Sequence, residues 1–334
     1  MFRGSMNALA RDARGICACV FLAIAAATLP TNISAQVGRI EVHPLTASTA
    51  SDIELLTGRR SGVNTTLAAE LRFPAGKRGR VPAVVLLHGS GGMGPWIADW
   101  VQWLNDLGFA TLAVDSFSGR GIVHTVVDQD QLGRLAMVVD AYAALDLLSK
   151  HARIDAQQVV VMGFSRGGHA ALYASLKRLQ GVSGVAGPSF AAFVAFYPPC
   201  NTLYRDDTVV ADVPIRIFHG GADDWVPVAP CRDYIARLQA AGKDAELAEY
   251  PGALHGFDSR STAALVRSNE GQTTRNCRLA ELNEGRVVNA ETRQEFTNKD
   301  PCVERGATFG YSEAASLSAQ KSLRDLLILI AQRK

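Results

Sequence analysis

Residues 159–168 read Val-Val-Val-Met-Gly-Phe-Ser-Arg-Gly-Gly, and this stretch decides the fold. An apolar run ends at Gly163, and Ser165 then stands between that glycine and Gly167, ahead of a helix-forming segment at 170–174. A Gly-x-Ser-x-Gly sequence between a strand and a helix predicts a sharp, strained turn that lifts the serine hydroxyl clear of the sheet. Glycine suits the flanking positions because it has no side chain to collide where strand and helix cross. We interpret the stretch as a nucleophile elbow; the alternative is a glycine-rich turn that binds phosphate.

Apolar runs and helical patterns alternate along the rest of the chain. Of the 334 residues, 48% are hydrophobic and 20% are charged, which is ordinary for a globular protein with a large core. Strands are expected at 39–42, 66–73, 81–87, 110–114, 159–164, 191–197, 215–220 and 245–250, and helices at 96–107, 128–151 (with Asp128 as its cap), 228–241 and 314–332. The alternation predicts one α/β domain over residues 36–334, with a mostly parallel, doubly wound sheet and helices on both faces.

The charge balance gives no sign of a polyanionic partner. The chain has 34 basic and 32 acidic residues, a net charge of +2, and no basic block. We therefore expect neither nucleic acid nor an anionic membrane surface as a partner.

The first 35 residues are typical of a secretory signal peptide. A basic start precedes an apolar run at 16–29 and a small-residue exit at Ser34-Ala35. We expect cleavage after Ala35 and export to the periplasm or the exterior. The alternative is a membrane anchor, but the run of about 14 residues is shorter than the roughly 20 that span a bilayer. Stable membrane insertion is therefore not expected.

Four cysteines follow that segment, and an even number in an exported chain predicts two disulfides. They allow three connectivities. We favour Cys200–Cys231 and Cys277–Cys302 because each pair brackets a local excursion of the chain. Free, buried cysteines are the alternative.

Residues 259–311 are polar and rich in Arg, Glu and Asn, and they contain the second cysteine pair. A structureless stretch of this length is unusual in a compact domain. We therefore interpret it as a disulfide-pinned insertion over the mouth of the active site, with a disordered surface loop as the alternative.

An acid and a base follow Ser165 in the chain. Asp223 comes just after the strand at 215–220, and His255 lies in the loop after the last strand. The order Ser, Asp, His is that of α/β-hydrolases, in which the histidine activates the serine and the acid orients the histidine. Taken singly, Asp223 could be a helix cap and His255 a solvated loop residue. Asp224 is expected to cap the following helix or to bind backbone.

Several segments resemble the dienelactone hydrolase family of the α/β-hydrolase fold. They are HGSGG (88–92), DSFSGRG (115–121), GFSRGG (163–168), FYPPC (196–200), HGGADDWVP (219–227) and YPGALHGF (250–257). The resemblance implies Ser165, Asp223 and His255 as nucleophile, acid and base. It also implies oxyanion donors at the Arg166 N–H and at Ser90, with Gly91 as the substitute.

Two departures from the family affect the expected specificity. The founding members have cysteine in the elbow where this chain has Ser165, and the insertion at 259–311 falls where a substrate pocket would be roofed. We therefore expect an ester specificity broader than dienelactone itself, in a hydrolase of carboxylic esters or lactones. The Ser-His-Asp chemistry needs no metal or other cofactor. A short peptidase like the prolyl oligopeptidases, or a binding protein without catalysis, is the alternative.

Overall fold

The structure is a computed structural model that describes residues 38–59, 62–183, 187, 189–262 and 265–333. The expected signal peptide at 1–35 lies outside these residues. Within them, no helix combines the length and the apolar character needed to cross a membrane.

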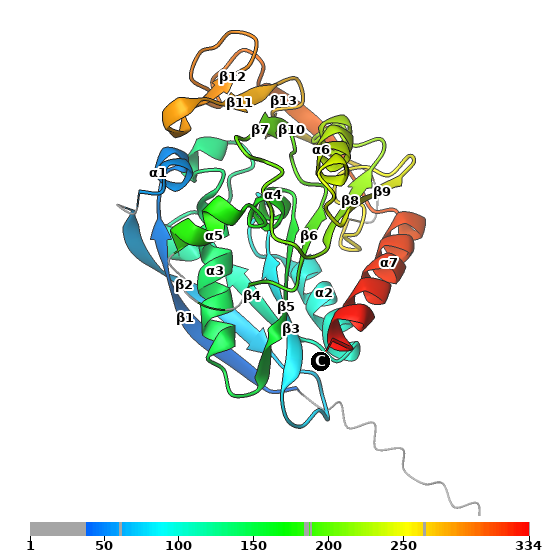
Figure 1. Ribbon diagram of the computed structural model, residues 1–334. Helices are drawn as coiled ribbons and strands as arrows, with labels where there is room; N and C mark the ends of the chain where they lie inside the picture. Colours follow the sequence, from blue (N-terminus) through cyan, green and yellow to red (C-terminus); the bar gives the residue numbers. More distant parts are fainter. Residues whose placement is uncertain (1–37, 60–61, 184–186, 188, 263–264, 334) are drawn as a thin grey trace, which may run out of the picture. The chain divides into compact units, whose positions relative to one another are not determined.

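An eight-stranded sheet forms the centre of the fold (Figure 1). Its strands, in spatial order, are β1 (Ile40–Thr49), β2 (Val63–Arg72), β4 (Ala110–Asp115), β3 (Val81–Leu87), β5 (Ile154–Phe164), β6 (Ala192–Phe196), β8 (Ile215–Gly220) and β9 (Ala245–Tyr250). β2 runs antiparallel to β1 and β4, and the six strands from β4 to β9 are parallel. The expected mostly parallel α/β architecture is confirmed.

The strand β3 explains why both faces of the sheet carry helices. All of its side chains except Pro82 are buried, and Val85 and Leu87 belong to one core cluster while Val84 and Leu86 belong to the other. The first face is covered by α1 (Asp52–Thr57), α3 (Ala136–Ser149), α4 (Arg166–Tyr173), α5 (Lys177–Ser183) and α6 (Ala229–Ala240). The second is covered by α2 (Pro95–Asp106) and α7 (Glu313–Ala331).

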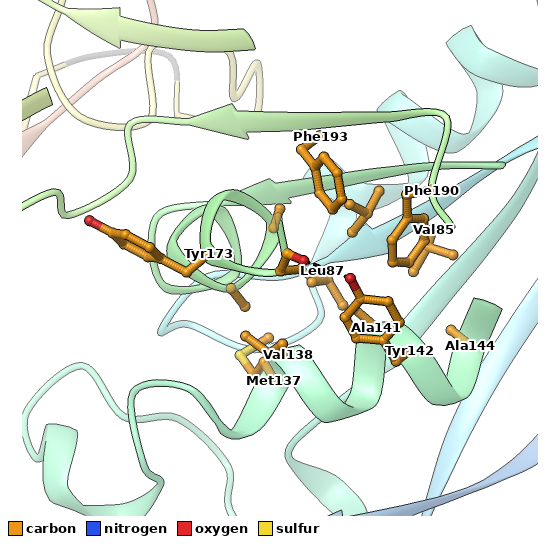
Figure 2. Packing of buried hydrophobic residues seen from close by; sticks show 14 of the residues in the cluster. Val85, Leu87, Met137, Val138, Ala141, Tyr142, Ala144, Tyr173, Phe190 and Phe193 are labelled. Carbon is orange, nitrogen blue, oxygen red and sulfur yellow. Dashed lines mark hydrogen bonds between the residues drawn. The ribbon is translucent and has the colours of Figure 1, made fainter. Parts of the chain in front are cut away.

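Helices α3 and α4 pack against the sheet on one face, next to β3 (Figure 2). Figure 2 shows Met137, Val138 and Ala141 of α3 facing Leu87 of β3. The Tyr142 hydroxyl donates to the Ala174 carbonyl at 2.6 Å, which links α3 to the end of α4. Since α4 begins directly after Ser165, this layer also sets the position of the serine.

The start of α3 differs from the prediction. Asp128 does not cap a long helix; it accepts a hydrogen bond from the Asp130 N–H at 3.2 Å at the short 3₁₀ helix Gln129–Gln131. The α-helix begins at Ala136, where the Asp52 carboxylate of α1 accepts hydrogen bonds from the N–H groups of Arg134 and Leu135. This carboxylate comes from more than 80 residues away, and no local pattern shows it.

Residues 259–311 contain regular structure. β10 (Val266–Thr273) and β13 (Glu304–Phe309) form a two-stranded antiparallel ribbon, and β11 (Leu279–Glu281) pairs with β12 (Val287–Asn289) and β7 (Thr202–Leu203). The structure has the disulfides Cys200–Cys231 and Cys277–Cys302. This is the pairing favoured from the sequence.

A buried ion pair ties the loop after β4 to α3. The Arg120 guanidinium makes two hydrogen bonds to the Asp140 carboxylate, at 2.8 and 2.7 Å, with side chains 4% and 0% exposed. Arg120 also donates to the Ser116 carbonyl and to the Thr49 hydroxyl. The cation therefore has partners from three parts of the chain.

We expect Asp140→Asn to lower the free energy of unfolding by about 3–5 kcal/mol, because it leaves a buried guanidinium without its counter-charge. Urea denaturation measures this change. The control is Asp146→Asn on the same helix, which breaks an exposed pair with Lys150 and should cost no more than about 1 kcal/mol. Equal losses in the two variants would contradict the assignment.

Candidate active site

Ser165 lies in a strained turn between β5 and α4. Its backbone has φ 51° and ψ −112°, a conformation that residues other than glycine rarely adopt. The turn is held because the Ser165 N–H donates to the Phe196 carbonyl of β6 at 2.9 Å, while the Ser165 carbonyl accepts from the His169 N–H at 2.8 Å. The backbone strain is thus maintained by hydrogen bonds on both sides of the serine.

Glycines allow the helix to approach the strand ends. A Cβ on Gly163 would lie 2.0 Å from the Gly167 carbonyl oxygen, and one on Gly167 would lie 2.3 Å from the Leu87 carbonyl oxygen. A Cβ on Gly168 would lie 2.7 Å from the Phe196 carbonyl oxygen. The Gly-x-Ser-x-Gly-Gly sequence is therefore required by backbone packing around Ser165.

The structure brings Ser165, Asp223 and His255 into one hydrogen-bonded chain. His255 Nδ1 lies 2.8 Å from Asp223 Oδ2, and His255 Nε2 lies 3.0 Å from Ser165 Oγ. A carboxylate only accepts hydrogen bonds, so Nδ1 carries the proton and Nε2 is free to accept from the serine hydroxyl. The second oxygen of Asp223 accepts from the N–H groups of Trp225 and Val226 at 2.9 and 2.8 Å. Asp223 is thereby oriented by its own loop.

Aromatic rings hold the imidazole from two sides. The Tyr197 ring lies 4.6 Å and the Trp225 ring 5.4 Å from the His255 ring, centroid to centroid. His255 is only 8% exposed as a result. Such packing restricts the rotation of the imidazole away from Ser165.

The buried Asp258 lies behind this wall. Its carboxylate accepts hydrogen bonds from Trp100 Nε1 and from the Tyr197 hydroxyl, both at 2.7 Å. Burial raises the pKa of Asp258, although its two hydrogen bonds act in the opposite direction. Asp258 therefore anchors Tyr197 and makes no hydrogen bond to His255.

The turn after β3 lies next to Ser165, since a Cβ on Gly89 would be 3.4 Å from the Ser165 Cβ. The Ser116 N–H donates to His88 Nε2 at 3.1 Å, so Nδ1 carries the proton and donates to the Gly89 carbonyl at 2.8 Å. That carbonyl also accepts from the Gly92 N–H at 3.1 Å. Because a trans peptide directs its N–H opposite to its C=O, these bonds orient the Ser90 N–H. Within the described residues, the N–H groups of Ser90 and Gly91 have no acceptor in the protein.

The other expected donor, the Arg166 N–H, lies at a helix N-terminus. Arg166 is the first residue of α4, and N–H groups in the first turn of a helix have no partner within the helix. The Arg166 side chain is bonded elsewhere, since its guanidinium donates to the carbonyls of Gln129 and Leu132. Burial lowers the pKa of Arg166 to about 10.

The sheet order explains why these groups meet. The chain leaves β3 toward β4 on one side and returns to β5 on the other, so strand order reverses between β3 and β5. Ligands in open α/β sheets bind at the carboxyl ends of the strands at such a point. Ser90 follows β3, and Ser165 follows β5.

A cavity of about 360 Å³ opens beside the serine. The expected site residues that line it are Ser90, Gly91, Ser165, Arg166 and His255. Aromatic side chains form much of the wall: Trp96, Phe164, Tyr197, Trp225 and Phe309. Residues 259–311 also contribute the polar side chains Ser268, Gln272 and Thr274. The buried Asp223 lies behind His255 and does not line it. The cavity has the volume and the largely apolar lining of a small-molecule site.

Asp224 has a different role from its neighbour. It caps no helix, since α6 starts after Val228 without a side-chain cap; of the two roles expected for it, binding to backbone is the one observed. Its carboxylate accepts hydrogen bonds from the N–H and the hydroxyl of Thr308, at 2.7 and 2.8 Å. The partner lies on β13, which is remote in sequence.

Two further residues of the cavity were not found from the sequence. His169 lies one turn into α4, between the Pro199 carbonyl at 3.0 Å and the Tyr204 hydroxyl at 3.2 Å. Burial keeps the pKa of His169 well below its ordinary value, so it is neutral. Arg134 donates to Asn201 Oδ1 at 3.2 Å, and its buried Nη1 has no hydrogen-bond partner among the described residues. Neither residue belongs to a local motif, so only the fold shows that they line the cavity.

This arrangement of strands, elbow and cavity can be compared with known proteins. Residues 67–281, more than half of the chain, match the dienelactone hydrolase family. The chain belongs to the dienelactone hydrolase family. The resemblance noted in the sequence is therefore confirmed.

Two curated relatives are about one quarter identical to this chain over the aligned residues. A Bradyrhizobium sp. protein named as a 2-oxo-3-(5-oxofuran-2-ylidene)propanoate lactonase is 26% identical over 194 residues, 54% of this chain and 74% of that protein. A Methylorubrum extorquens protein named as a carboxymethylenebutenolidase is 26% identical over 277 residues, 75% of this chain and 90% of that protein.

A solved structure shows the same fold. A Klebsiella pneumoniae protein named as a dienelactone hydrolase superposes with a TM-score of 0.56 at 17% identity, over 88% of this chain and 100% of that one. The family match ends at Glu281. Residues 282–311, which contain β12 and β13, therefore lie beyond it.

We expect Gly163→Ala to lower the free energy of unfolding by about 3 kcal/mol or more, because the added methyl group would overlap the backbone of α4. The soluble yield and the urea midpoint measure the effect. Gly181→Ala is the matched control, since a Cβ there meets nothing within 4 Å and alanine favours helix. A Gly163→Ala protein as stable as the control would contradict the close packing of α4 on β5.

Proposed function

We propose that this dienelactone hydrolase family member hydrolyses small carboxylic esters or lactones through an acyl-enzyme on Ser165. The observation that carries the proposal is the hydrogen-bonded chain from Asp223 through His255 to Ser165, which opens onto the cavity. A serine hydroxyl is a weak nucleophile and needs an adjacent base. His255 Nε2 is within proton-transfer distance of it.

In the first step, Ser165 Oγ attacks the carbonyl carbon while His255 Nε2 accepts the hydroxyl proton. The imidazolium so formed faces the Asp223 carboxylate, which stabilises it and fixes the tautomer. The tetrahedral intermediate then expels the alcohol, which takes the proton from Nε2. Water repeats the sequence on the acyl-enzyme, releases the carboxylic acid and restores Ser165.

Two backbone N–H groups are proposed to hold the oxyanion. The Ser90 N–H is oriented by the His88 and Gly92 contacts, and the Arg166 N–H lies at the N-terminus of α4, with the Gly91 N–H as the substitute. Donors that are fixed before the reaction stabilise the developing charge without reorganisation, by about 3 kcal/mol each. No step in this scheme calls for a metal or other cofactor.

We expect Ser165→Ala to lower kcat for p-nitrophenyl esters by about 10⁴- to 10⁶-fold with an unchanged fold, as for other serine triads. Stopped assays of p-nitrophenol release measure kcat, and circular dichroism checks the fold. Ser259→Ala, in the same cavity, is the control and should retain most activity. Full activity in Ser165→Ala would exclude this mechanism.

The substrate is proposed to carry a carboxylate. The buried Nη1 of Arg134 lacks a hydrogen-bond partner within the described residues, and Arg134 lines the cavity. A buried donor without a partner costs about 1–3 kcal/mol, which an anionic ligand group would offset. The Bradyrhizobium relative is named for a lactone that bears a propanoate group, and a lactone of that kind has the required charge.

We expect Arg134→Gln to raise KM about 10- to 100-fold for a lactone or ester that bears a carboxylate, since a charge-assisted hydrogen bond contributes about 1.5–3 kcal/mol. The comparison is kcat/KM for that substrate against its methyl ester, in which the charge is absent. The preference for the acid should collapse in Arg134→Gln and be partly kept in Arg134→Lys. Parallel losses on both substrates would show that Arg134 only supports the fold.

The protein is further proposed to work outside the cytosol. The two disulfides support this proposal, since such bonds persist in oxidising compartments and are rare in the cytosol.

A further inference from the structure

The loop that carries Asp223 is bonded to the ribbon of β10 and β13 through its next two residues. Asp224 binds the Thr308 backbone and hydroxyl on β13. The Trp225 indole Nε1 donates to the Gln272 carbonyl of β10 at 2.9 Å, and the Trp225 carbonyl accepts from the Thr273 hydroxyl at 2.6 Å. The ribbon is thus hydrogen-bonded to the two residues that directly follow Asp223, the proposed acid of the triad.

The loop that carries His255 is bonded to the same ribbon. The His255 carbonyl accepts from the Gly310 N–H at 3.0 Å, and His255 forms a parallel β-bridge with Phe309, the last residue of β13. The Phe309 ring also lies 5.9 Å from the Trp225 ring, which itself packs on the imidazole. One strand therefore contacts both the acid loop and the base loop.

Arg275 joins the ribbon to the acid loop at its other end. Its Nη1 donates to the Asp224 carbonyl at 2.6 Å and lies 3.8 Å from the Asp224 carboxylate, while Nη2 donates to the Gly306 carbonyl of β13. The Arg275 side chain is 19% exposed. The Cys277–Cys302 disulfide closes the ribbon just beyond it.

We propose that the β10/β13 ribbon is a positioning clamp for the Asp223–His255 pair, in which Asp224 and Arg275 are the positioning residues. The inference rests on the proposed function. Neither residue lines the cavity, so each acts through the loop backbone. The two loops leave different strands, β8 and β9, and near the strand ends they are bonded to each other, from the Gly221 N–H to the Tyr250 carbonyl and from the Ala222 N–H to the Ala253 carbonyl. The clamp adds contacts beyond these bonds, where Asp223 Oδ2 reaches His255 Nδ1.

The clamp would raise the rate for two reasons, one entropic and one geometric. Each loop residue that is free to move costs about 1–2 kcal/mol to order, and a small misplacement of a catalytic group can cost a large factor in rate. Bonds from both loops to one ribbon remove that freedom before substrate binds. The titratable groups that face His255 are Asp223, His219, Asp258 and Tyr197, and neither Asp224 nor Arg275 bonds to their side chains. A changed pH profile in clamp variants would therefore report the Asp223–His255 contact.

The experiment measures ester hydrolysis and the rate at which diethyl p-nitrophenyl phosphate inactivates the enzyme, for wild type, Asp224→Ala and Arg275→Ala. We expect kcat and the inactivation rate constant to fall together by about tenfold or more, with KM within about twofold of wild type. The acid limb of the pH–rate profile should move toward lower pH, because the protonated imidazole loses part of its carboxylate partner. Arg275→Lys should recover part of the rate.

Arg305→Ala is the matched control. Arg305 lies on the same strand but donates to the Glu270 carbonyl within the ribbon and to Val127, away from both loops. Its kinetics and pH profile should match wild type. Thr308→Val, which removes only the hydroxyl bond to Asp224, gives a milder test should Asp224→Ala fail to fold.

Two results would overturn the clamp alone, and a third would overturn the proposed function. Unchanged kcat and inactivation rates in both clamp variants, or a rise in KM alone, would leave the ribbon as a wall of the cavity. An unshifted pH profile with a lower fraction of active protein would show a general structural role. A wild type that neither hydrolyses esters nor reacts with the phosphate ester would overturn the proposed function itself, and this result differs from the other two.

Discussion

The backbone crossing of β5 and α4 at Ser165 is the constraint on which the rest of the site depends. Helix α4 runs so close to the strand ends that Gly163 and Gly167 have no room for a Cβ. That approach forces Ser165 into a positive φ, and the neighbouring strand β6 holds it there with a hydrogen bond. The serine hydroxyl is thereby presented at the edge of the sheet. Helix α3 and the strands on either side support this crossing from the core.

The two halves of the site are held by different kinds of structure. Ser165 and Ser90 follow adjacent parallel strands, β5 and β3, whose register pairs Gly163 with Leu87. Their relative position is set by the sheet. Asp223 and His255 lie farther out on loops after β8 and β9, where ladder hydrogen bonds have ended. The two loops are bonded to each other from the Gly221 N–H to the Tyr250 carbonyl and from the Ala222 N–H to the Ala253 carbonyl. The contacts to β10 and β13 are a second support, on the side of the loops away from the sheet.

Three buried histidines have a structural role, and their surroundings differ from those of His255, the proposed catalytic base. His88 and His219 each place Nδ1 near the carbonyl of the glycine that follows, at 2.8 and 3.1 Å, at the ends of β3 and β8. Burial lowers the pKa of both, and of His169, so they stay neutral and orient backbone. Among the histidines whose rings contact the cavity, His255 alone in the described chain has a direct carboxylate contact at hydrogen-bond distance. The partner, more than the residue type, gives it a separate role.

The sequence by itself determined the features that depend on local geometry. The elbow, the strands of the main sheet and the family follow from residues close together in the chain, because turns, periodicity and glycine crossings are local constraints; the short helices α1 and α5 were not predicted. The order of Ser165, Asp223 and His255 was also readable, since each follows a strand end. Only the tertiary structure decided the contacts between distant segments: Asp52 at the start of α3, Arg134 in the cavity, and Asp224 on Thr308. These side chains are brought next to their partners by the packing of the sheet and its loops. The spacing of residues along the chain does not reveal which distant segments will be in contact.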